Sequence, residues 1–209
     1  MRRIGLGIFL FAMTCGLLQA AEGQRASAGL HMGILVPSLN RLQDSDVLSN
    51  WRYDVGWGLD LNYDVSRDLS LAVFYDLYPM RYHGLADRSD VRLGAITGRV
   101  GIIQHFGGEV HYNFVHFDSN AVFTGASYDY FLADQTVSGS YFEGAEQIQF
   151  SETAKLDKGT IGVLIGISSQ LSSHVSLVFR LKPIFYWWND RSQIQFITAA
   201  ANLSIGYMF

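Results

Sequence analysis

The sequence lacks the features that mark a disulfide-stabilised, a nucleic-acid-binding or a helical membrane protein. Its one cysteine, Cys15, lies in the amino-terminal segment, so the rest of the chain has no thiol to form a disulfide. The formal net charge is −4, and a mildly acidic chain is a poor candidate for binding nucleic acid. After that segment, the longest apolar run is about seven residues, at 161–167, whereas a transmembrane helix needs ~20. The 49% hydrophobic content must therefore be distributed in another way.

The amino-terminal segment has the layout of a secretory signal peptide. Arg2 and Arg3 precede an apolar stretch at 4–18, and the small residue Ala20 follows it. We expect cleavage after Ala20, with a signal peptide at 1–20 and one mature domain at 21–209. Cleavage changes the net charge from −4 to −6, because the segment holds two arginines and no acid. The positions before Cys15 hold Ala12 and Thr14, which do not fit a lipid-attachment signal.

Alternation of apolar and polar residues is the main pattern in the rest of the chain. In the segment 51–64 the odd positions are all apolar or aromatic, and the even positions are charged, polar or glycine. A period of two indicates a β-strand with one apolar face. The segment 197–209 alternates in the same way and ends on Phe209. A closed membrane barrel would pair that last strand on both sides and place Phe209 at a lipid interface.

The alternation predicts eight strands joined by alternately short and long connections. We expect strands at 28–36, 51–64, 69–78, 91–106, from 110 onward, 161–168, 175–185 and 197–209. Short turns are expected at 65–68, 107–109 and 172–174, and long loops at 37–50, 80–90 and 124–158. Short periplasmic turns and long extracellular loops are typical of outer-membrane barrels. The sequence therefore predicts an all-β protein, an eight-stranded antiparallel up-and-down transmembrane β-barrel in the cell outer membrane.

The two faces of these strands predict two further groups of residues. Aromatic side chains at the strand ends are expected at the membrane interfaces: Trp51, Tyr53 and Trp187 at the outer rim, and Tyr63, Tyr207 and Phe209 at the inner one. Inward-facing charges are expected to form a network in the lumen: Asp54, Asp60, Asp76, Arg180 and Lys182. Buried unpaired charges are costly, so we expect Arg180 to cross the lumen, pair with the carboxylates and plug the barrel. Lys182 and Arg99 would be further members, and a lining for charged solutes is the alternative.

Three segments resemble the small outer-membrane barrels of Gram-negative bacteria, which include the OmpA membrane domain, OmpX and the OmpW family. They are GLDLNYDVSRDLSLAVFYDL, ISSQLSSHVSLVFRLK and LSIGYMF. The OmpW family is the most similar in the order of its hairpins and its long third loop. The resemblance implies lipid and lipopolysaccharide as partners, and assembly machinery that reads the carboxy-terminal strand. For OmpW-like barrels it also implies passage of small apolar molecules. Ser204 stands where the assembly signal often has glycine.

We expect a non-catalytic barrel that acts as a narrow channel or through surface loops. One alternative is a lipid A hydrolase that uses His116 and Ser119, since FVHFDSN is loosely similar to a stretch of the deacylase PagL, although the spacing differs by one residue. A strand that leaves the membrane and becomes polar explains the same residues. Another alternative is an adhesin acting through the loop 130–155. The histidines show no metal-binding spacing, and no phosphate loop is present, so neither metal nor cofactor is expected.

Overall fold

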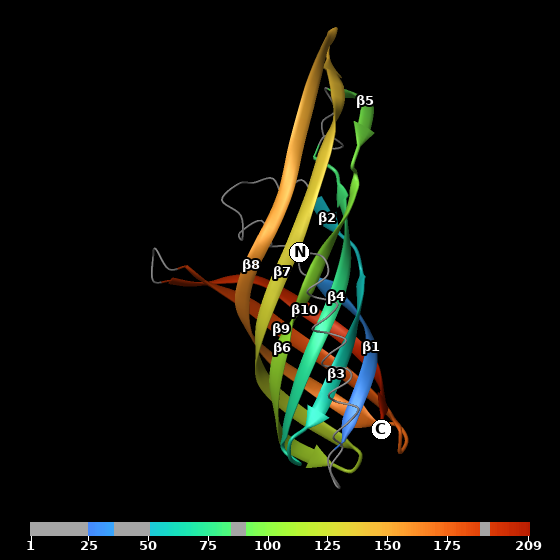
Figure 1. The fold of residues 1–209 in the computed structure, drawn as a ribbon, viewed down its shortest axis with the longest axis vertical. Helices are drawn as coiled ribbons and strands as arrows, with labels where there is room; N and C mark the ends of the chain where they lie inside the picture. Colours follow the sequence, from blue (N-terminus) through green and yellow to red (C-terminus); the bar gives the residue numbers. More distant parts are fainter. Residues whose placement is uncertain (1–24, 36–50, 85–90, 189–192) are drawn as a thin grey trace.

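The structure, a computed structural model, describes residues 25–35, 51–84, 91–188 and 193–209, and these form antiparallel β-strands (Figure 1). The expected signal peptide lies outside the described residues. No helix in the described ranges is long and apolar enough to cross a membrane. The strands are β1 (Ala26–Leu35), β2 (Trp51–Tyr53), β3 (Gly56–Asp64), β4 (Leu69–Tyr82), β5 (Val91–Thr97), β6 (Val100–Phe117), β7 (Asn120–Glu143), β8 (Glu146–Gln170), β9 (Val175–Trp188) and β10 (Gln193–Met208).

Eight of these strands close into a barrel. Going round the wall, β1 is followed by β3, β4, β6, β7, β8, β9 and β10, and each pairs antiparallel with the next. The ring closes where β10 pairs with β1, from Ser27 opposite Met208 to Leu35 opposite Ala200. Because closure leaves no free sheet edge, every wall strand has two partners, as a membrane barrel requires. The predicted all-β, eight-stranded antiparallel transmembrane barrel is confirmed.

The middle of the chain departs from the predicted strand boundaries. The segment 107–109 is not a turn, because Gly107 and Gly108 lie inside β6 and pair with β4 and β7. A β-carbon on Gly107 would lie 2.0 Å from the backbone oxygen of Tyr128, so close strand approach explains this glycine. The turn instead falls at Asp118 and Ser119, where Asp118 adopts a positive φ of 51°. Asp tolerates that conformation better than most residues.

The expected loop at 124–158 is a β-hairpin. Strands β7 and β8 pair without interruption from Asn120 opposite Ser169 to Glu143 opposite Glu146. The connection is the two-residue turn Gly144–Ala145, and Gly144 has the positive φ of 63° that such a tight turn needs. In Figure 1 this hairpin rises well beyond the other wall strands, and β5 accompanies it along part of β7. Above the apolar belt the outward face is polar, so the alternation there is weak and the sequence resembles a loop.

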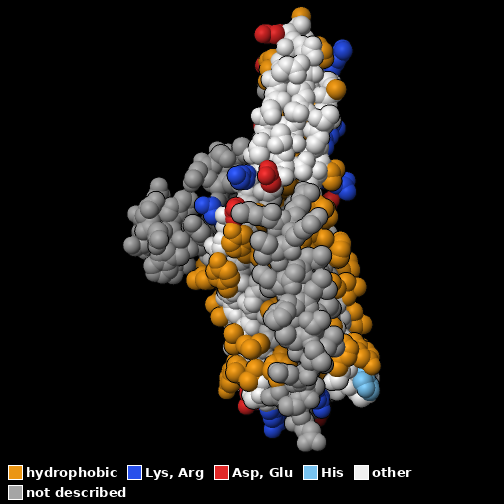
Figure 2. Space-filling model, viewed as in Figure 1, with side chains coloured by type: hydrophobic (Ala, Val, Ile, Leu, Met, Phe, Trp, Pro, Cys, Tyr) orange, Lys and Arg blue, Asp and Glu red, His pale blue; other side chains and the backbone are white. Residues whose placement is uncertain are grey.

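The outward face of the wall is apolar. Exposed hydrophobic side chains from every wall strand form a belt, and among them are the expected Leu30, Met32, Ile34, Ile161, Val163, Ile165, Ile167, Leu177, Phe179, Leu181, Leu203 and Ile205. Figure 2 shows hydrophobic side chains along the lower, wider part of the molecule, whereas the protruding part is mostly polar and carries both charge signs. This belt is the surface that the hydrocarbon of a bilayer covers.

Candidate functional site

Four carboxylates and four basic side chains alternate in a closed ring across the lumen, which we call the lumen ring. All eight are at most 5% exposed, and they come from β1, β3, β4, β6, β7 and β9. In ring order they are Asp60, His31, Asp76, His105, Asp129, Lys182, Glu109 and Arg180.

Arg180 and Lys182, both on β9, make the cationic side of the ring. The guanidinium of Arg180 donates to Asp60 at 2.7 Å and to Glu109 at 3.0 Å. The ammonium of Lys182 donates to Glu109 at 2.9 Å and to Asp129 at 2.6 Å. Strands β3 and β6 are not neighbours of β9, so Arg180 spans the lumen as expected. The Nζ of Lys182 also lies 3.9 Å from the centre of the Phe74 ring, a cation–π contact.

Two histidines complete the opposite side of the ring. The Nδ1 of His31 lies 3.0 Å from Asp60, and its Nε2 contacts Asp76. The Nδ1 of His105 lies 2.9 Å from Asp76, and its Nε2 lies 2.8 Å from Asp129. Each imidazole therefore bridges two carboxylates on different strands. Together with the β9 cations, these bridges tie six strands of the wall to one another through the interior.

Neutral donors supply further hydrogen bonds to the carboxylates of the ring. Ser204 donates to Asp60 at 2.9 Å, and Asn62 donates to the other oxygen of Asp60 at 2.8 Å. Tyr78 donates to Asp76 at 3.2 Å, and Ser127 donates to Asp129 at 2.5 Å. Such extra donors make a buried ionic cluster more tolerable, because they satisfy lone pairs that the ion pairs leave over. Each charged group of the lumen ring thus has at least two partners, although the Nε of Arg180 has none among the described residues.

An apolar layer fills the lumen on the hairpin side of the ring. Its members occupy the next inward positions along the same strands: Ile103 precedes His105, Phe131 follows Asp129, and Ile184 follows Lys182. These three side chains are fully buried. The other members are Leu35, Trp51, Tyr78, Met80, Ala133, Val137, Ala154, Leu156 and Ala200. Eight strands leave an interior that side chains just fill, and here an ionic and an apolar layer do so in series.

A polar cavity of about 520 Å³ lies at the turn end of the barrel, and we call it the vestibule. It is lined by side chains of the β3–β4 and β6–β7 turns and by inward residues of the adjoining strands, including Asn62, Ser70 and His111. His111 connects the vestibule to the ring, because its Nε2 lies 2.8 Å from Glu109. The ring and the apolar layer together separate the vestibule from the hairpin side.

The structure brings together four of the five expected network residues, namely Asp60, Asp76, Arg180 and Lys182. Asp54 is a correction, because it lies in the break between β2 and β3 and pairs with Arg81 at 3.0 Å, with both side chains largely exposed. The break disturbs the alternation, so Asp54 and Val55 are both exposed. Arg99 is also a correction, since it is exposed between β5 and β6.

Sequence reasoning missed four members of the ring. His31 was detectable, because it lies between the outward-facing Leu30 and Met32 and must point inward. His105 is in the expected strand 91–106, Glu109 is in the expected turn 107–109, and Asp129 is in the expected loop 124–158. Gly58 makes room for His31 and Asp76, whose atoms would lie 2.6 and 2.3 Å from a β-carbon there.

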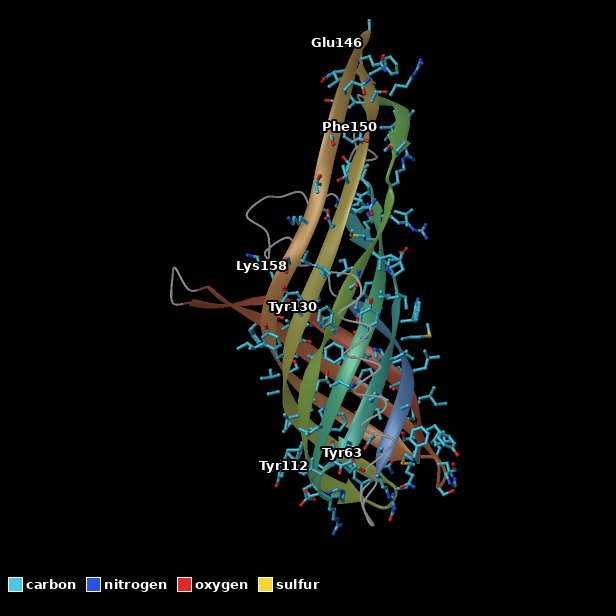
Figure 3. All side chains as sticks on the ribbon, in the orientation of Figure 1. Tyr63, Tyr112, Tyr130, Glu146, Phe150 and Lys158 are labelled. Atoms are coloured by element: carbon cyan, nitrogen blue, oxygen red, sulfur yellow. The ribbon has the colours of Figure 1, made fainter. Side chains whose placement is uncertain are left out.

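The expected interface aromatics have different surroundings. Trp51 is a correction, because it is 3% exposed and packs edge-on against Tyr82 with ring centres 5.5 Å apart. Packing against the other members of the apolar layer draws this side chain inward. Tyr207 and Phe209 are exposed, with ring centres 5.4 Å apart, and Tyr63 lies at the same end in Figure 3. The side chains of Tyr53 and Trp187 are outside the described set.

The histidine and serine considered for hydrolysis lie at the mouth of the vestibule. Ser119 is in the two-residue turn, and the Nε2 of exposed His116 lies 2.9 Å from Asp68. A serine nucleophile needs its histidine within hydrogen-bond reach, and among the described hydrogen bonds none joins His116 to Ser119. Within the described ranges, no group of three His, Cys, Asp or Glu side chains is arranged to hold a metal ion.

The protruding hairpin has a packed face and a polar face. Phe150 stacks on Tyr82 with ring centres 6.1 Å apart, and Tyr141 lies 6.2 Å from Phe150. The hydroxyl of Tyr82 donates to Glu152 at 3.1 Å, and burial together with this carboxylate raises the pKa of Tyr82, so the phenol stays a donor. The opposite face of β8 presents exposed polar side chains: Gln147, Gln149, Ser151, Thr153, Lys155 and Asp157. Figure 3 labels Glu146 at its tip and Lys158 near its base.

Comparison with solved structures gives similar barrels at low sequence identity. A major outer membrane protein from Thermus thermophilus has a TM-score of 0.50 and 13% identity, covering 90% of this chain and 100% of that one. Neisserial surface protein A has a TM-score of 0.45 and 17% identity over 91% of this chain and 98% of that one. Ail, the attachment invasion locus protein of Yersinia pestis, has a TM-score of 0.45 and 8% identity over 89% and 99%.

No protein-family model and no curated protein matches the sequence. At these identities the structural likeness establishes the fold and leaves the activity open. The closed ring of eight antiparallel strands, the apolar belt and the filled lumen agree with that likeness. The chain therefore has the fold of an eight-stranded outer-membrane β-barrel.

Proposed function

We propose that this protein is a non-catalytic outer-membrane barrel whose β7–β8 hairpin presents a binding surface outside the cell. The observation that carries the proposal is the contrast between a filled lumen and an ordered protrusion. The interior holds the lumen ring and the apolar layer in series, which favours a surface role over passage of solutes. The hairpin is paired along its whole length and holds a fixed polar face clear of the apolar belt (Figure 2).

The orientation follows from the connections. The turns at 65–68, 118–119 and 171–174 are short and lie at the same end as Ala26 and Phe209. Outer-membrane barrels place short turns in the periplasm and longer connections outside. On this basis the hairpin tip at Gly144 projects from the outer surface, and the vestibule faces the periplasm. A preformed, rigid hairpin loses little conformational freedom on binding, which favours recognition by its outward polar side chains.

A shortened hairpin tests the proposal in whole cells. Asp134 and Lys155 are opposite each other on β7 and β8, so replacing residues 135–154 by Asn-Gly closes the hairpin lower down without altering the register of the wall. Cells that display each form are compared for adhesion to matrix proteins, to sulfated glycans and to cells of their own kind. We expect the native form to adhere to at least one surface, and the shortened form to lose that adhesion while staying folded in the membrane.

A second measurement on the same two proteins distinguishes the surface-binding function from that of a channel. Both are placed in planar bilayers, and conductance is recorded in simple salt. We expect background conductance from the native protein. Steady conductance by the native protein, with equal adhesion by both forms, would overturn the surface-binding function in favour of a channel.

A further inference from the structure

Both histidines of the lumen ring lie between two hydrogen-bond acceptors. A neutral imidazole has one N–H donor and one acceptor nitrogen, whereas a carboxylate only accepts. His31 has Asp60 on Nδ1 at 3.0 Å and Asp76 on Nε2. His105 has Asp76 on Nδ1 and Asp129 on Nε2, at 2.9 and 2.8 Å. The geometry of both side chains fits an imidazolium, which donates from both nitrogens.

The charge count of the ring leads to the same state. Asp60, Asp76, Asp129 and Glu109 carry four negative charges, and Arg180 with Lys182 carries two positive ones. Two imidazolium ions make the sum zero, whereas two neutral imidazoles leave a net charge of −2 in a region that is at most 5% exposed. A buried charge without a partner is strongly unfavourable.

The groups that face each histidine come from several strands. Asp60, Asp76, Arg180 and Ser204 surround His31, from β3, β4, β9 and β10.

His105 faces Asp76 and Tyr78 on β4, Asp129 on β7 and Lys182 on β9. Its ring also stacks on Phe131, with centres 4.2 Å apart. Arg180 shares an oxygen of Asp60 with His31, and Lys182 shares an oxygen of Asp129 with His105. Asp76 lies between the two histidines, and its described partners are His31, His105 and Tyr78.

We propose that His31 and His105 are held as imidazolium cations at neutral pH, and that these two protons make the lumen ring an alkaline-sensitive lock on the barrel. When the protons are transferred to hydroxide, each histidine keeps one N–H donor, and the lone pair of its other ring nitrogen then faces a carboxylate. The ring then carries net negative charge, and the six strands that it joins lose their shared neutral centre. His111 and Asn62 line the vestibule and contact Glu109 and Asp60, so the vestibule is the side from which hydroxide would approach the ring.

This inference does not depend on the surface-binding function, and its test reads protonation directly. Mature protein with ¹⁵N-labelled histidine is studied by NMR in detergent micelles at about pH 8, where an ordinary histidine with a pKa of ~6.5 is neutral. We expect at least two side chains with both ring nitrogens protonated, and loss of one such signal in each of His31→Gln and His105→Gln. The exposed His174 provides the matched control, since His174→Gln should leave both signals in place. Fewer than two imidazolium signals in the native protein would overturn the proposal.

Unfolding in urea supplies a second readout. The unfolded chain binds few histidine protons above about pH 6.5, so the contribution of the ring is fully present below that pH and declines as the pH rises. We expect the urea midpoint of the native protein and of His174→Gln to fall between about pH 7 and pH 9.5, below the range in which tyrosine and lysine titrate. The His31→Gln and His105→Gln variants should lose part of this pH dependence. A native midpoint that stays constant over this range would contradict the lock, and it is measurable even if neither variant folds.

Discussion

Replacing Arg180 with alanine removes a side chain that joins β9 to both β3 and β6 across the lumen. It breaks the contacts with Asp60 at 2.7 Å and with Glu109 at 3.0 Å. Removing one partner of a buried ion pair costs about 3–5 kcal/mol, because the other charge stays buried. Here Asp60 keeps His31, Asn62 and Ser204 as donors. Because Glu109 also keeps Lys182, we expect a loss near the lower limit, about 3 kcal/mol of unfolding free energy.

Two further variants fix the interpretation of that number. Arg180→Lys keeps the charge, but a single ammonium replaces a planar group that contacts two carboxylates, so about 2 kcal/mol should be lost with one charged hydrogen bond. Arg67→Ala, in the exposed turn at 65–68, should change stability by no more than ~0.5 kcal/mol. Equilibrium unfolding in urea, followed by the heat-modifiable mobility of the folded barrel, measures all three. An Arg180→Ala variant as stable as Arg67→Ala would refute the reasoning.

Conductance of the same variant shows which layer seals the barrel. From the sequence alone, loosening the ionic plug should admit ions. In the structure the apolar layer with Phe131 lies next to the ring, so we expect Arg180→Ala to stay near background in planar bilayers. The double variant Arg180→Ala, Phe131→Ala should conduct. If Arg180→Ala alone conducts as much as the double variant, the ring is the seal.

Three other results are expected. A short epitope inserted between Gly144 and Ala145 should be labelled by antibody on intact cells, and one inserted after Arg67 should not, because the two turns lie at opposite ends; labelling of both on sealed cells would contradict the orientation. Ile165→Arg, on the apolar belt, should cost ~2–4 kcal/mol in urea unfolding, and a cost near zero would remove Ile165 from the lipid face. Gly58→Ala should cost ~1–3 kcal/mol, because its β-carbon would lie 2.6 Å from the backbone oxygen of Tyr75; native stability would show that the strands can separate there.

The sequence by itself determined the orientation of side chains on those strands that have lipid on one side and the lumen on the other. Lipid outside and a filled lumen inside impose strict alternation, so the outward Ile161, Val163 and Ile165 and the inward Arg180 and Lys182 could be assigned from order alone. The need to pair buried charges also predicted that Arg180 crosses the lumen, because its carboxylate partners lie on strands that are not its neighbours.

Only the tertiary structure decided the positions of residues that lie beyond the lipid-facing wall, or whose partners are distant in sequence. Beyond the apolar belt the outward face of the β7–β8 hairpin is polar, so its strands have no lipid-driven alternation and Asp129 could not be placed. In β6 the glycines permit close strand approach in place of a turn, which concealed His105 and Glu109. The break at Asp54 reverses the expected faces of Trp51 and Asp54. Closure of the ring depends on the registers of six strands at once, and each register depends on where the turns fall. With a turn expected at 107–109 in place of 118–119, the partners of His105, Glu109 and Asp129 could not be derived.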